Sequence, residues 1–268
     1  MTKIDFDEPN TSEWLKWRKK CSAKTQKVID SGGLKSGSRS NLYKKQKDVY
    51  INQNGPFNGK CAYCESYITK LDDLDHFRPR NSVTDYDNNP ILIDGPDGNK
   101  TKHRGYYWLE NDWKNLLPAC KDCNRITKKN GVKIGKGKRF PIKGKYAIQP
   151  GEEKNEIPLL INPVETEPQK HLEYENRTGC LIAVNKSENG QICIDVFGLN
   201  LRERLVENRK TAYKEAFNNI WDKIRELNEV GPTNKWSAFQ KEFALECSQK
   251  GHTIARKAAY EHIQSFFP

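Results

Sequence analysis

The sequence predicts a mixed α+β protein that holds a structural zinc site, with a helix near its N-terminus and a mainly helical C-terminal region. Two CxxC pairs, Cys61/Cys64 and Cys120/Cys123, indicate the metal site. Between residues 52 and 141 the chain is rich in turns and aromatic residues and offers only short candidate strands. The last third, beginning with "NLRERLVENRKTAYKEAFNNIWDKIREL", repeats apolar residues at helical spacing.

The first predicted element is a helix over residues 11–29. Apolar side chains recur there at helical spacing behind a Thr-Ser cap, Trp14 and Cys21 among them. The segment "DSGGLKSGSRS" that follows has the composition of a linker. We therefore treat residues 1–45 as a helical N-terminal segment, and the sequence assigns it no role.

The remainder divides into a zinc-containing core over residues 46–150 and a C-terminal region over residues 151–268. In the core, "DYDNNPILIDGPDGNK" is typical of an exposed loop inserted between motifs. In the C-terminal region, residues 181–184 and 191–195 flank "NKSENG", which predicts a β-hairpin. "NEVGPTN" predicts a break before the helices "KWSAFQKEFALECSQK" and "HTIARKAAYEHIQSFF".

The overall charge favours a polyanionic partner. The 268 residues carry a formal net charge of +11, and clustered Lys and Arg gain affinity for nucleic acid by releasing counterions from phosphates. No stretch approaches the roughly 18 apolar residues that span a bilayer, so we expect a soluble, cytoplasmic protein without a membrane partner. In a reducing compartment the eight cysteines are metal ligands or buried thiols rather than disulfides. Four of them we interpret as packing residues: Cys21, Cys180, Cys193 and Cys247.

The two CxxC pairs predict a tetrahedral four-cysteine zinc site, with Zn–S distances near ~2.3 Å. A redox motif is the alternative for one pair alone, but two pairs favour zinc. Zinc would offset the entropy of closing the long loop between Cys64 and Cys120. A structural zinc site by itself does not indicate catalysis.

Asp75 and His76 stand together in "LDDLDHFRPR", and Asn124 directly follows the last cysteine. A neutral imidazole can accept a proton at physiological pH, and a carboxylate oxygen is a ligand that Mg²⁺ prefers. On an extended strand the two neighbours would point to opposite faces, whereas a twist or bulge near Pro79 could let one bind a metal while the other addresses a water. An isolated Asp-His pair is nevertheless more often structural than catalytic.

In these residues the sequence resembles the HNH endonucleases of the ββα-metal type. The matching positions are Asp75-His76, Asn115-Leu116 and Cys123-Asn124. A finer resemblance is to the Septu and retron-associated branch, the PtuB-like proteins of bacterial anti-phage defence, and spans residues 57–213. The motifs that carry it are "CAYCE", "LDHFRPR", "YYWLENDWKNLLPACKDCN", "KRFPI", "PLLINP" and "FGLNLRERLVENR".

The resemblance implies a ββα-metal core and a hydrolytic mechanism. His76 would be the general base, and Asp75 and Asn124 would hold one catalytic Mg²⁺ or Mn²⁺. Asn115 would orient His76 through the other ring nitrogen. The final position is Asn where many HNH enzymes have His, and Lys128 stands one place later than the usual basic residue. The role of His103 is left open.

A basic stretch from Lys121 to Lys145 holds ten Lys or Arg residues against Asp122 alone, interleaved with glycines. It predicts contact with a phosphate backbone beside the site, and a solvated flexible loop is the alternative. The predicted nucleic-acid contacts are Arg78, Arg80, Arg125, Lys128, Lys129, Lys133, Lys138 and Arg139.

The resemblance also implies partners. These are an SMC/ABC-like, PtuA-like ATPase and, for retron-linked members, a reverse transcriptase with its RNA/DNA hybrid. DNA is the favoured substrate, and RNA such as tRNA remains open. The apolar stripes of the C-terminal helices would serve either docking of the ATPase or the protein's own core. The alternative function is a zinc-stabilised nucleic-acid-binding module without hydrolytic activity, which would have no need of His76.

Overall fold

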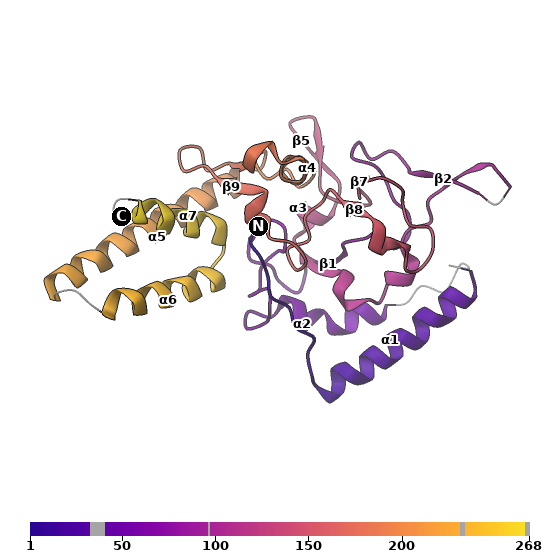
Figure 1. Ribbon diagram of the computed structural model, residues 1–268, viewed down its shortest axis with the longest axis horizontal. Helices are drawn as coiled ribbons and strands as arrows, with labels where there is room; N and C mark the ends of the chain where they lie inside the picture. The colour runs from indigo at the N-terminus through magenta and orange to yellow at the C-terminus, as the bar shows by residue number, and fades with distance from the viewer. Residues whose placement is uncertain (33–40, 96, 231–233, 266–268) are drawn as a thin grey trace.

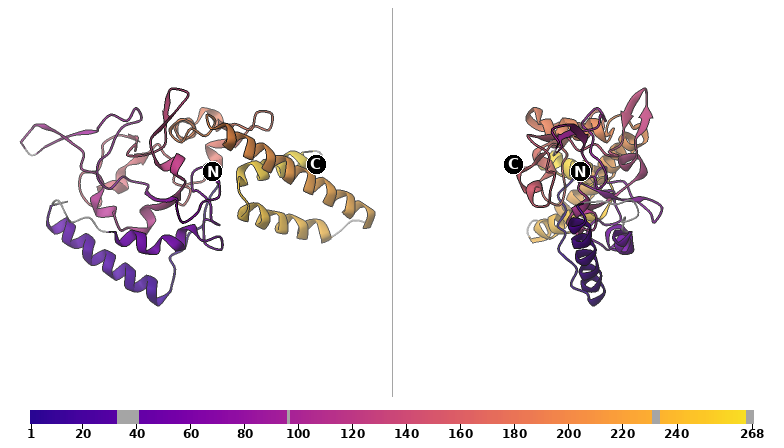
Figure 2. Two further views of the ribbon diagram at one scale, coloured as in Figure 1. Left: turned by 180° about the vertical axis from the view of Figure 1, so that it is seen from behind. Right: turned by 90° about the vertical axis from the view of Figure 1, so that its right-hand side faces the viewer.

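The computed structural model of the chain describes residues 1–32, 41–95, 97–230 and 234–265, without the side chains of residues 227–238. Most of the predicted linker and the centre of the predicted helix break lie outside these ranges. The molecule is elongated: a core of small sheets with α1 and α2 occupies one end, and α5, α6 and α7 extend from it to the other (Figure 1). The view from behind shows the same two parts (Figure 2).

Short elements dominate the core and long helices the C-terminal region. The α-helices are α1 (Ser12–Asp30), α2 (Lys47–Ile51), α3 (Lys121–Asn124), α4 (Glu188–Val196), α5 (Glu203–Val230), α6 (Asn234–Gln249) and α7 (Thr253–Gln264). The 3₁₀ helices are η1 (Leu42–Gln46), η2 (Tyr107–Leu109), η3 (Trp113–Asn115), η4 (Glu152–Asn155), η5 (Pro168–Lys170) and η6 (Val184–Lys186). None of the helices in the described ranges is long and apolar enough to cross a membrane.

The strands are all short and form antiparallel pairs in the described part of the chain. They are β1 (Asp73–His76) with β4 (Leu116–Ala119), β2 (Leu92–Asp94) with β3 (Lys100–Lys102), β5 (Thr127–Lys129) with β6 (Val132–Ile134), β7 (Ile142–Lys143) with β8 (Ile157–Pro158), and β9 (Leu172–Tyr174) with β10 (Leu181–Ala183). The predicted exposed loop after the Asp-His motif contains the β2–β3 hairpin, whose strands have no buried residue. The mixed α+β class is confirmed.

The predicted N-terminal helix is present as α1. The Thr11 side chain accepts a hydrogen bond from the Trp14 backbone N–H at 3.2 Å, which satisfies one of the free amides of the first turn. Trp14, Trp17, Cys21 and Val28 are buried against the core, at the helical spacing of one face. The opposite face of α1 is left to solvent.

The predicted hairpin over residues 181–195 is wrong. Its first strand exists as β10, but β10 pairs with β9, and the second predicted strand lies in helix α4. The Ser187 hydroxyl caps this helix by accepting a hydrogen bond from the Gly190 N–H at 3.2 Å. Burial of Cys193 and Val196 follows a helical period rather than alternation. The short apolar run at residues 191–195 fits both a strand and a helix, and the Ser187 cap and the tertiary packing favour the helix.

The predicted C-terminal helices are present as α5, α6 and α7. Their apolar side chains build a second hydrophobic cluster of buried residues: Ala216, Ile220, Ile224, Phe243, Cys247, Ala259 and Ile263. The protein's own core therefore accounts for the apolar stripe of α5. The buried Lys60 ammonium donates to the Thr253 hydroxyl at 2.9 Å and joins α7 to the loop that carries the first cysteine pair.

Candidate metal centre and Asp-His site

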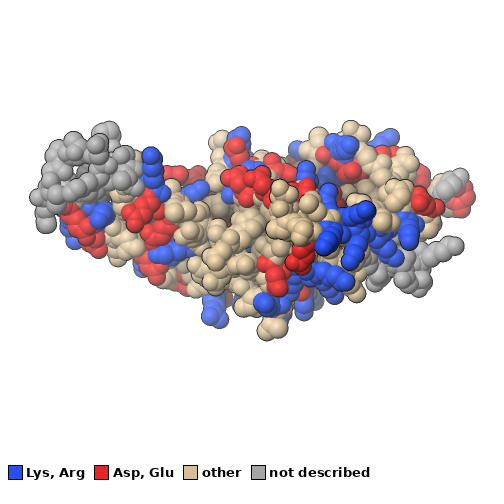
Figure 3. All heavy atoms as spheres, turned by 90° about the horizontal axis from the view of Figure 1, so that it is seen from below, with Lys and Arg blue, Asp and Glu red and all other residues tan. Residues whose placement is uncertain are grey.

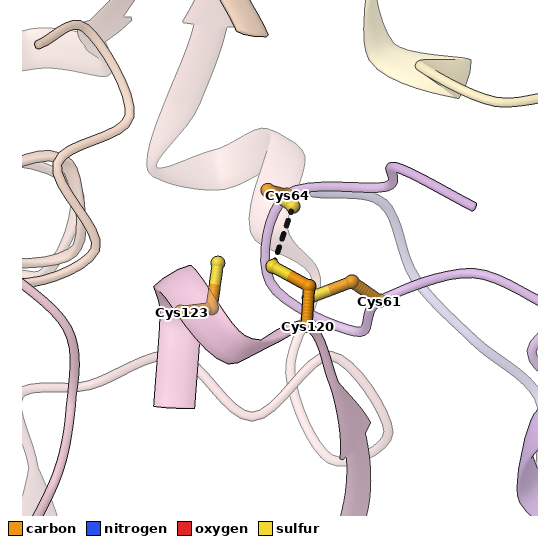
Figure 4. Close-up of side chains that lie close together, drawn as sticks. All are labelled: Cys61, Cys64, Cys120 and Cys123. Carbon is orange, nitrogen blue, oxygen red and sulfur yellow. Dashed lines mark hydrogen bonds between the residues drawn. The ribbon is translucent and has the colours of Figure 1, made fainter. Parts of the chain in front are cut away.

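The four cysteines of the two CxxC pairs converge in the structure. Their sulfur atoms all lie within 4.8 Å of one another, and the Cys64 and Cys120 sulfurs are 3.7 Å apart. Ligands at about 2.3 Å from a tetrahedral zinc are about 3.8 Å from each other, so the sulfur set fits the size of the ion. Figure 4 shows the sulfurs directed towards a common centre from one turn and from the start of α3. The donor set and its geometry fit zinc.

Backbone hydrogen bonds hold the two cysteine pairs together. The Ala62 N–H, between Cys61 and Cys64, donates to the Pro118 carbonyl of β4 at 2.8 Å. The Cys123 and Asn124 N–H groups both donate to the Cys120 carbonyl, at 3.1 and 3.0 Å, and form the single turn of α3. The cluster therefore fixes where α3 begins relative to the strands.

Arg202, just before α5, supplies positive charge to the cysteine cluster. Its guanidinium donates to the Cys123 sulfur at 3.3 Å and to the Cys120 sulfur at 3.8 Å. Four thiolates around a divalent ion carry a net charge of −2, which such donors partly neutralise. Arg202 thereby connects the C-terminal region to the cysteine cluster. No pattern in the sequence signals this role, because the residue lies about 80 positions from its partners.

Asp75 lies on β1 beside the cluster and is buried. Its carboxylate accepts a hydrogen bond from the Tyr63 hydroxyl at 2.6 Å and is paired with the Lys136 ammonium at 3.1 Å. Lys136 is fully buried, and its ammonium also donates to the His76 carbonyl at 2.7 Å. Burial raises the pKa of Asp75 and lowers that of Lys136, and the attraction between the two charges opposes both shifts.

Asn124 points to a different carboxylate. Its side-chain amide donates to Asp73 at 3.0 Å. The same carboxylate accepts two hydrogen bonds from the Arg125 guanidinium, both at 2.9 Å. Asp73 and Asp75 share one face of β1, because residues two apart on a strand do so. The residues expected to hold the catalytic Mg²⁺ or Mn²⁺, Asp75 and Asn124, are thus each bound to another protein group. In this arrangement they do not fit a divalent ion.

Lys136 was missed as a site residue, although it stands between two glycines. Gly135 is required because a Cβ there would lie 1.9 Å from the Arg125 carbonyl oxygen. The Lys136 N–H donates to the Cys123 carbonyl at 2.7 Å, so the chain returns to α3 after the β5–β6 hairpin. The Gly-Lys-Gly sequence was the available signal, since glycines allow the close approach that brings the lysine to Asp75.

His76 is held by a backbone carbonyl. Its Nε2 lies 2.8 Å from the Glu110 carbonyl oxygen, which can only accept, so Nε2 carries the hydrogen and Nδ1 carries the lone pair. Burial lowers the pKa of the ring to about 3. The imidazole is therefore neutral at physiological pH, with one defined tautomer available to accept a proton.

Asn115 does not bond to the His76 ring, contrary to the expectation. Its side-chain amide donates to the carbonyls of Arg78 and Leu109, at 3.0 and 3.2 Å, and its oxygen accepts from the Arg78 N–H at 2.7 Å. It braces the turn that presents the Glu110 carbonyl to His76. The Glu110 main-chain carbonyl therefore orients the His76 ring, and Asn115 acts only indirectly through the turn.

Tyr43 of η1 covers His76. The two ring centroids are 4.7 Å apart in an edge-to-face arrangement, and His76 is only 8% exposed. The Arg80 guanidinium lies 4.9 Å from the centre of the Tyr43 ring and forms an ion pair with Glu110. The ring is therefore enclosed, and Tyr43 is one of the groups that a substrate would have to displace to reach His76.

The predicted nucleic-acid contacts divide into two groups. Arg78 is paired with Glu156 at 3.0 Å, Arg80 with Glu110 and Arg125 with Asp73, and Arg139 is buried against backbone carbonyls. Lys129 lies 3.9 Å from Glu203. The exposed ones without an acidic partner among the described residues are Lys128, Lys133 and Lys138. His103 is buried, with both ring nitrogens bonded to backbone groups, so it is structural.

The chain has curated relatives, but no family model and no solved structure matches it. It is 40% identical over 160 residues to Septu protein PtuB of Bacillus mycoides, a match of 58% of this chain and 48% of that protein. It is 26% identical over 175 residues to Septu protein PtuB of Bacillus thuringiensis, covering 64% and 48% of the two chains. It is 34% identical over 171 residues to Septu protein PtuA of Bacillus mycoides, covering 61% of this chain and 20% of that one. The chain spans about half the length of the PtuB relatives that it matches, and over more than half of its own length it is similar to proteins named for the Septu system.

Proposed function

We propose that the chain is an HNH-type endonuclease that hydrolyses phosphodiester bonds in nucleic acid and acts in a Septu-like anti-phage defence system. The observation that carries the proposal is the order strand, strand, helix formed by β1, β4 and α3, with Asp75 and His76 on the first strand and Asn124 on the helix. The cysteine cluster fixes that helix against the strands. The similarity to PtuB proteins supports the defence system, and the residues support the chemistry.

His76 is the group that would carry the reaction. Its Nδ1 takes a proton from water, the water oxygen forms a bond to phosphorus, and the bond from phosphorus to the 3′ oxygen breaks. The departing 3′ oxygen takes up a proton from solvent, and His76 then releases its proton to solvent. The Glu110 carbonyl keeps the ring in the required tautomer. As the ring becomes an imidazolium, its Nε2–H bond to that carbonyl strengthens, which stabilises the charge formed on the protein.

Under this proposal, the arrangement around His76 corresponds to a resting form. Tyr43 covers the proposed base, and Lys136 neutralises the proposed metal ligand Asp75. A catalytic Mg²⁺ or Mn²⁺, as the HNH resemblance implies, would require Asp75 to exchange the ammonium for the ion. Activity therefore depends on a rearrangement around β1.

We further propose an ATPase partner of the PtuA kind. Both PtuA and PtuB are named among the relatives, and a region similar to this chain makes up 20% of the longer PtuA protein. Presence of such a region in a protein named PtuA favours physical association of the two components. The ATPase would then be a candidate source of the rearrangement.

The test is cleavage by the chain purified with its neighbouring ATPase. Duplex DNA, single-stranded DNA and tRNA would each be incubated with Mg²⁺ or Mn²⁺ and with EDTA. We expect metal-dependent cleavage by the native protein and loss of at least about a hundredfold in rate for His76→Ala, the usual contribution of a general base. His171→Gln is the matched control, because the His171 ring lies 2.7 Å from the Ser187 hydroxyl and has no other side-chain hydrogen bond among the described residues. Equal cleavage by the native and His76→Ala proteins would refute the proposal.

A second candidate function is a zinc-stabilised nucleic-acid-binding module without hydrolytic activity. The enclosure of His76 and the pairing of Asp75 with Lys136 favour it, because neither group is open to a substrate. The same experiment separates the two. Binding of nucleic acid without cleavage, in the presence of the ATPase and both metals, would establish the module.

A further inference from the structure

Helix α1 presents a row of lysines on the face that it turns away from the core. Lys16, Lys19, Lys20 and Lys27 are all exposed. At 3.6 residues per turn, Lys16, Lys20 and Lys27 lie within about 40° of one another around the helix, with Lys19 about 60° to one side. The buried face, which carries Trp17 and Cys21, is centred roughly 130° away. The helical period that places the apolar residues on the buried face therefore places these lysines on the solvent face.

These lysines have no acidic partner among the described residues, whereas Arg18 on the same helix is paired with Glu8 at 3.2 Å. Glu13 is the only acid within the first turn. Figure 3, which views the molecule from the side of α1, shows Lys and Arg side chains gathered over this part of the surface, with Asp and Glu at the edge of the patch. Exposed ammonium groups without an acidic partner remain available to an anionic partner.

We propose that the lysine row of α1 binds the phosphate backbone of nucleic acid. Lys16 and Lys27 are separated by about 16 Å along the helix, which matches about half a turn of duplex. The flexible, charged side chain of lysine suits contacts with phosphates, which are the same at every position whatever the base sequence. This inference rests on the proposed function, because the bound nucleic acid would be the substrate that the Asp-His site cleaves.

The surface favours nucleic acid over a protein or a membrane. Protein interfaces usually centre on aromatic or apolar anchors, and Leu15 is the one large apolar side chain exposed on α1. Insertion into a membrane requires an apolar face, and the apolar face of α1 is buried in the core. A regular row of charges with little apolar area is the footprint of a phosphate backbone.

The helix that carries the row contacts the segment that covers the site. Trp17 of α1 donates from its indole nitrogen to the Leu42 carbonyl of η1 at 2.8 Å, and the next residue, Tyr43, covers His76. Lys44 and Lys45 of η1 are exposed and extend the positive surface from α1. Nucleic acid held by the row would therefore be retained beside the residue that covers the proposed base. By contrast, the cavity of about 560 Å³ beside the cysteine cluster mixes lysines with Asp122 and Glu203.

The test measures binding without cleavage, in a His76→Ala background, by the fluorescence anisotropy of a labelled DNA duplex at several salt concentrations. The test variant replaces Lys16, Lys19, Lys20 and Lys27 with Gln, a good helix former. The matched control removes the same charge from exposed lysines of the C-terminal region, with the substitutions Lys186→Gln, Lys214→Gln, Lys241→Gln and Lys257→Gln. A third variant replaces Lys128, Lys133 and Lys138, the exposed lysines of the predicted basic stretch. Circular dichroism verifies that all variants are folded.

We expect the α1 variant to bind about ten- to a hundredfold more weakly. Its salt slope should fall by up to about 3.6, since each of the four phosphate contacts contributes about 0.9. The matched control should bind within about twofold of the parent. Parent-like affinity and slope in the α1 variant would overturn the inference, and weakened binding of the third variant alone would move the contact to the basic stretch and leave the proposed function standing. If the α1 variant bound DNA as the parent does but no longer bound the ATPase, the inference would also be overturned. The lysine row would then bind an acidic surface of the ATPase. Absence of DNA binding by the parent, with and without the ATPase, would overturn the inference, whereas the proposed function would still be decided by the cleavage assays on DNA and tRNA.

Discussion

Replacement of Lys136 by Met tests whether the buried ion pair holds the Asp-His strand. The substitution keeps the length and apolar stem of the side chain and removes the ammonium that Asp75 and the His76 carbonyl share. Removal of one partner from a buried pair costs about 3–5 kcal/mol, because the other charge stays buried without compensation. With an m-value near 3 kcal/mol/M, the urea midpoint should fall by about 1–1.7 M.

The pH dependence identifies the cause of the loss. Burial already raises the pKa of Asp75, and Lys136 is the largest influence that lowers it, so the variant should raise this pKa further. A carboxyl whose pKa is higher in the folded than in the unfolded state contributes stability below the unfolded value and loses it as pH rises. The penalty of Lys136→Met should therefore be small at acidic pH and largest at neutral pH.

The double variant that combines Lys136→Met with Asp75→Asn is the control. The introduced carboxamide is neutral and its oxygen still accepts from the Tyr63 hydroxyl, so the double variant should recover most of the loss. Urea unfolding of the four proteins, at two pH values, gives the coupling energy directly. Additive losses, or a penalty for Lys136→Met that does not change with pH, would refute the assignment of the buried charge.

Three further outcomes follow from the site. Cys120→Ser should lose bound zinc and cooperative unfolding together, whereas retention of a native thermal transition without metal would contradict a structural role. Burial lowers the pKa of His76 to about 3, so the ring stays neutral in the folded protein. As pH falls from about 6.5 towards 3, the free energy of unfolding of the native protein should therefore fall by up to about 4–5 kcal/mol more than that of His76→Phe. Parallel urea stability curves would contradict this. Tyr43→Ala should expose His76 and move its pKa, followed by NMR of the ring, towards about 6.5; an unchanged value would show that other groups enclose it.

The sequence was sufficient for the features that local patterns determine. The capped periodic segment became α1, the long apolar repeats became α5 to α7, and the paired cysteines met as their spacing requires. Each of these depends on neighbours within one or two turns, or on a metal chemistry that allows few alternatives. The prediction of a strand at α4 failed because "QICID" suits a strand and a helix equally. The Ser187 cap and the packing of Cys193 favour the helix.

The detailed partners of the site residues could not be predicted, because they come from distant segments. Asp75 meets a lysine 61 positions away, and the His76 ring meets a backbone carbonyl 34 positions away. A carbonyl is present at every residue, so no sequence pattern distinguishes the one that orients a histidine. Motif spacing identifies which residues gather, whereas main-chain geometry determines which atoms they contact.

A hydrogen bond joins α1, which carries the lysine row, to η1, which covers the proposed base His76. The indole of Trp17 on α1 is bonded to the backbone next to Tyr43, so displacement of α1 and uncovering of His76 would be coupled. A ligand shifts a conformational equilibrium only by its difference in affinity for the two states. Nucleic acid on the lysine row would therefore favour the open form only if the phosphates bind better when Tyr43 has moved. Measurement of DNA affinity in Tyr43→Ala decides this. Tighter binding would mean that uncovering His76 and binding of DNA are linked, whereas equal binding would leave the opening to the proposed ATPase partner.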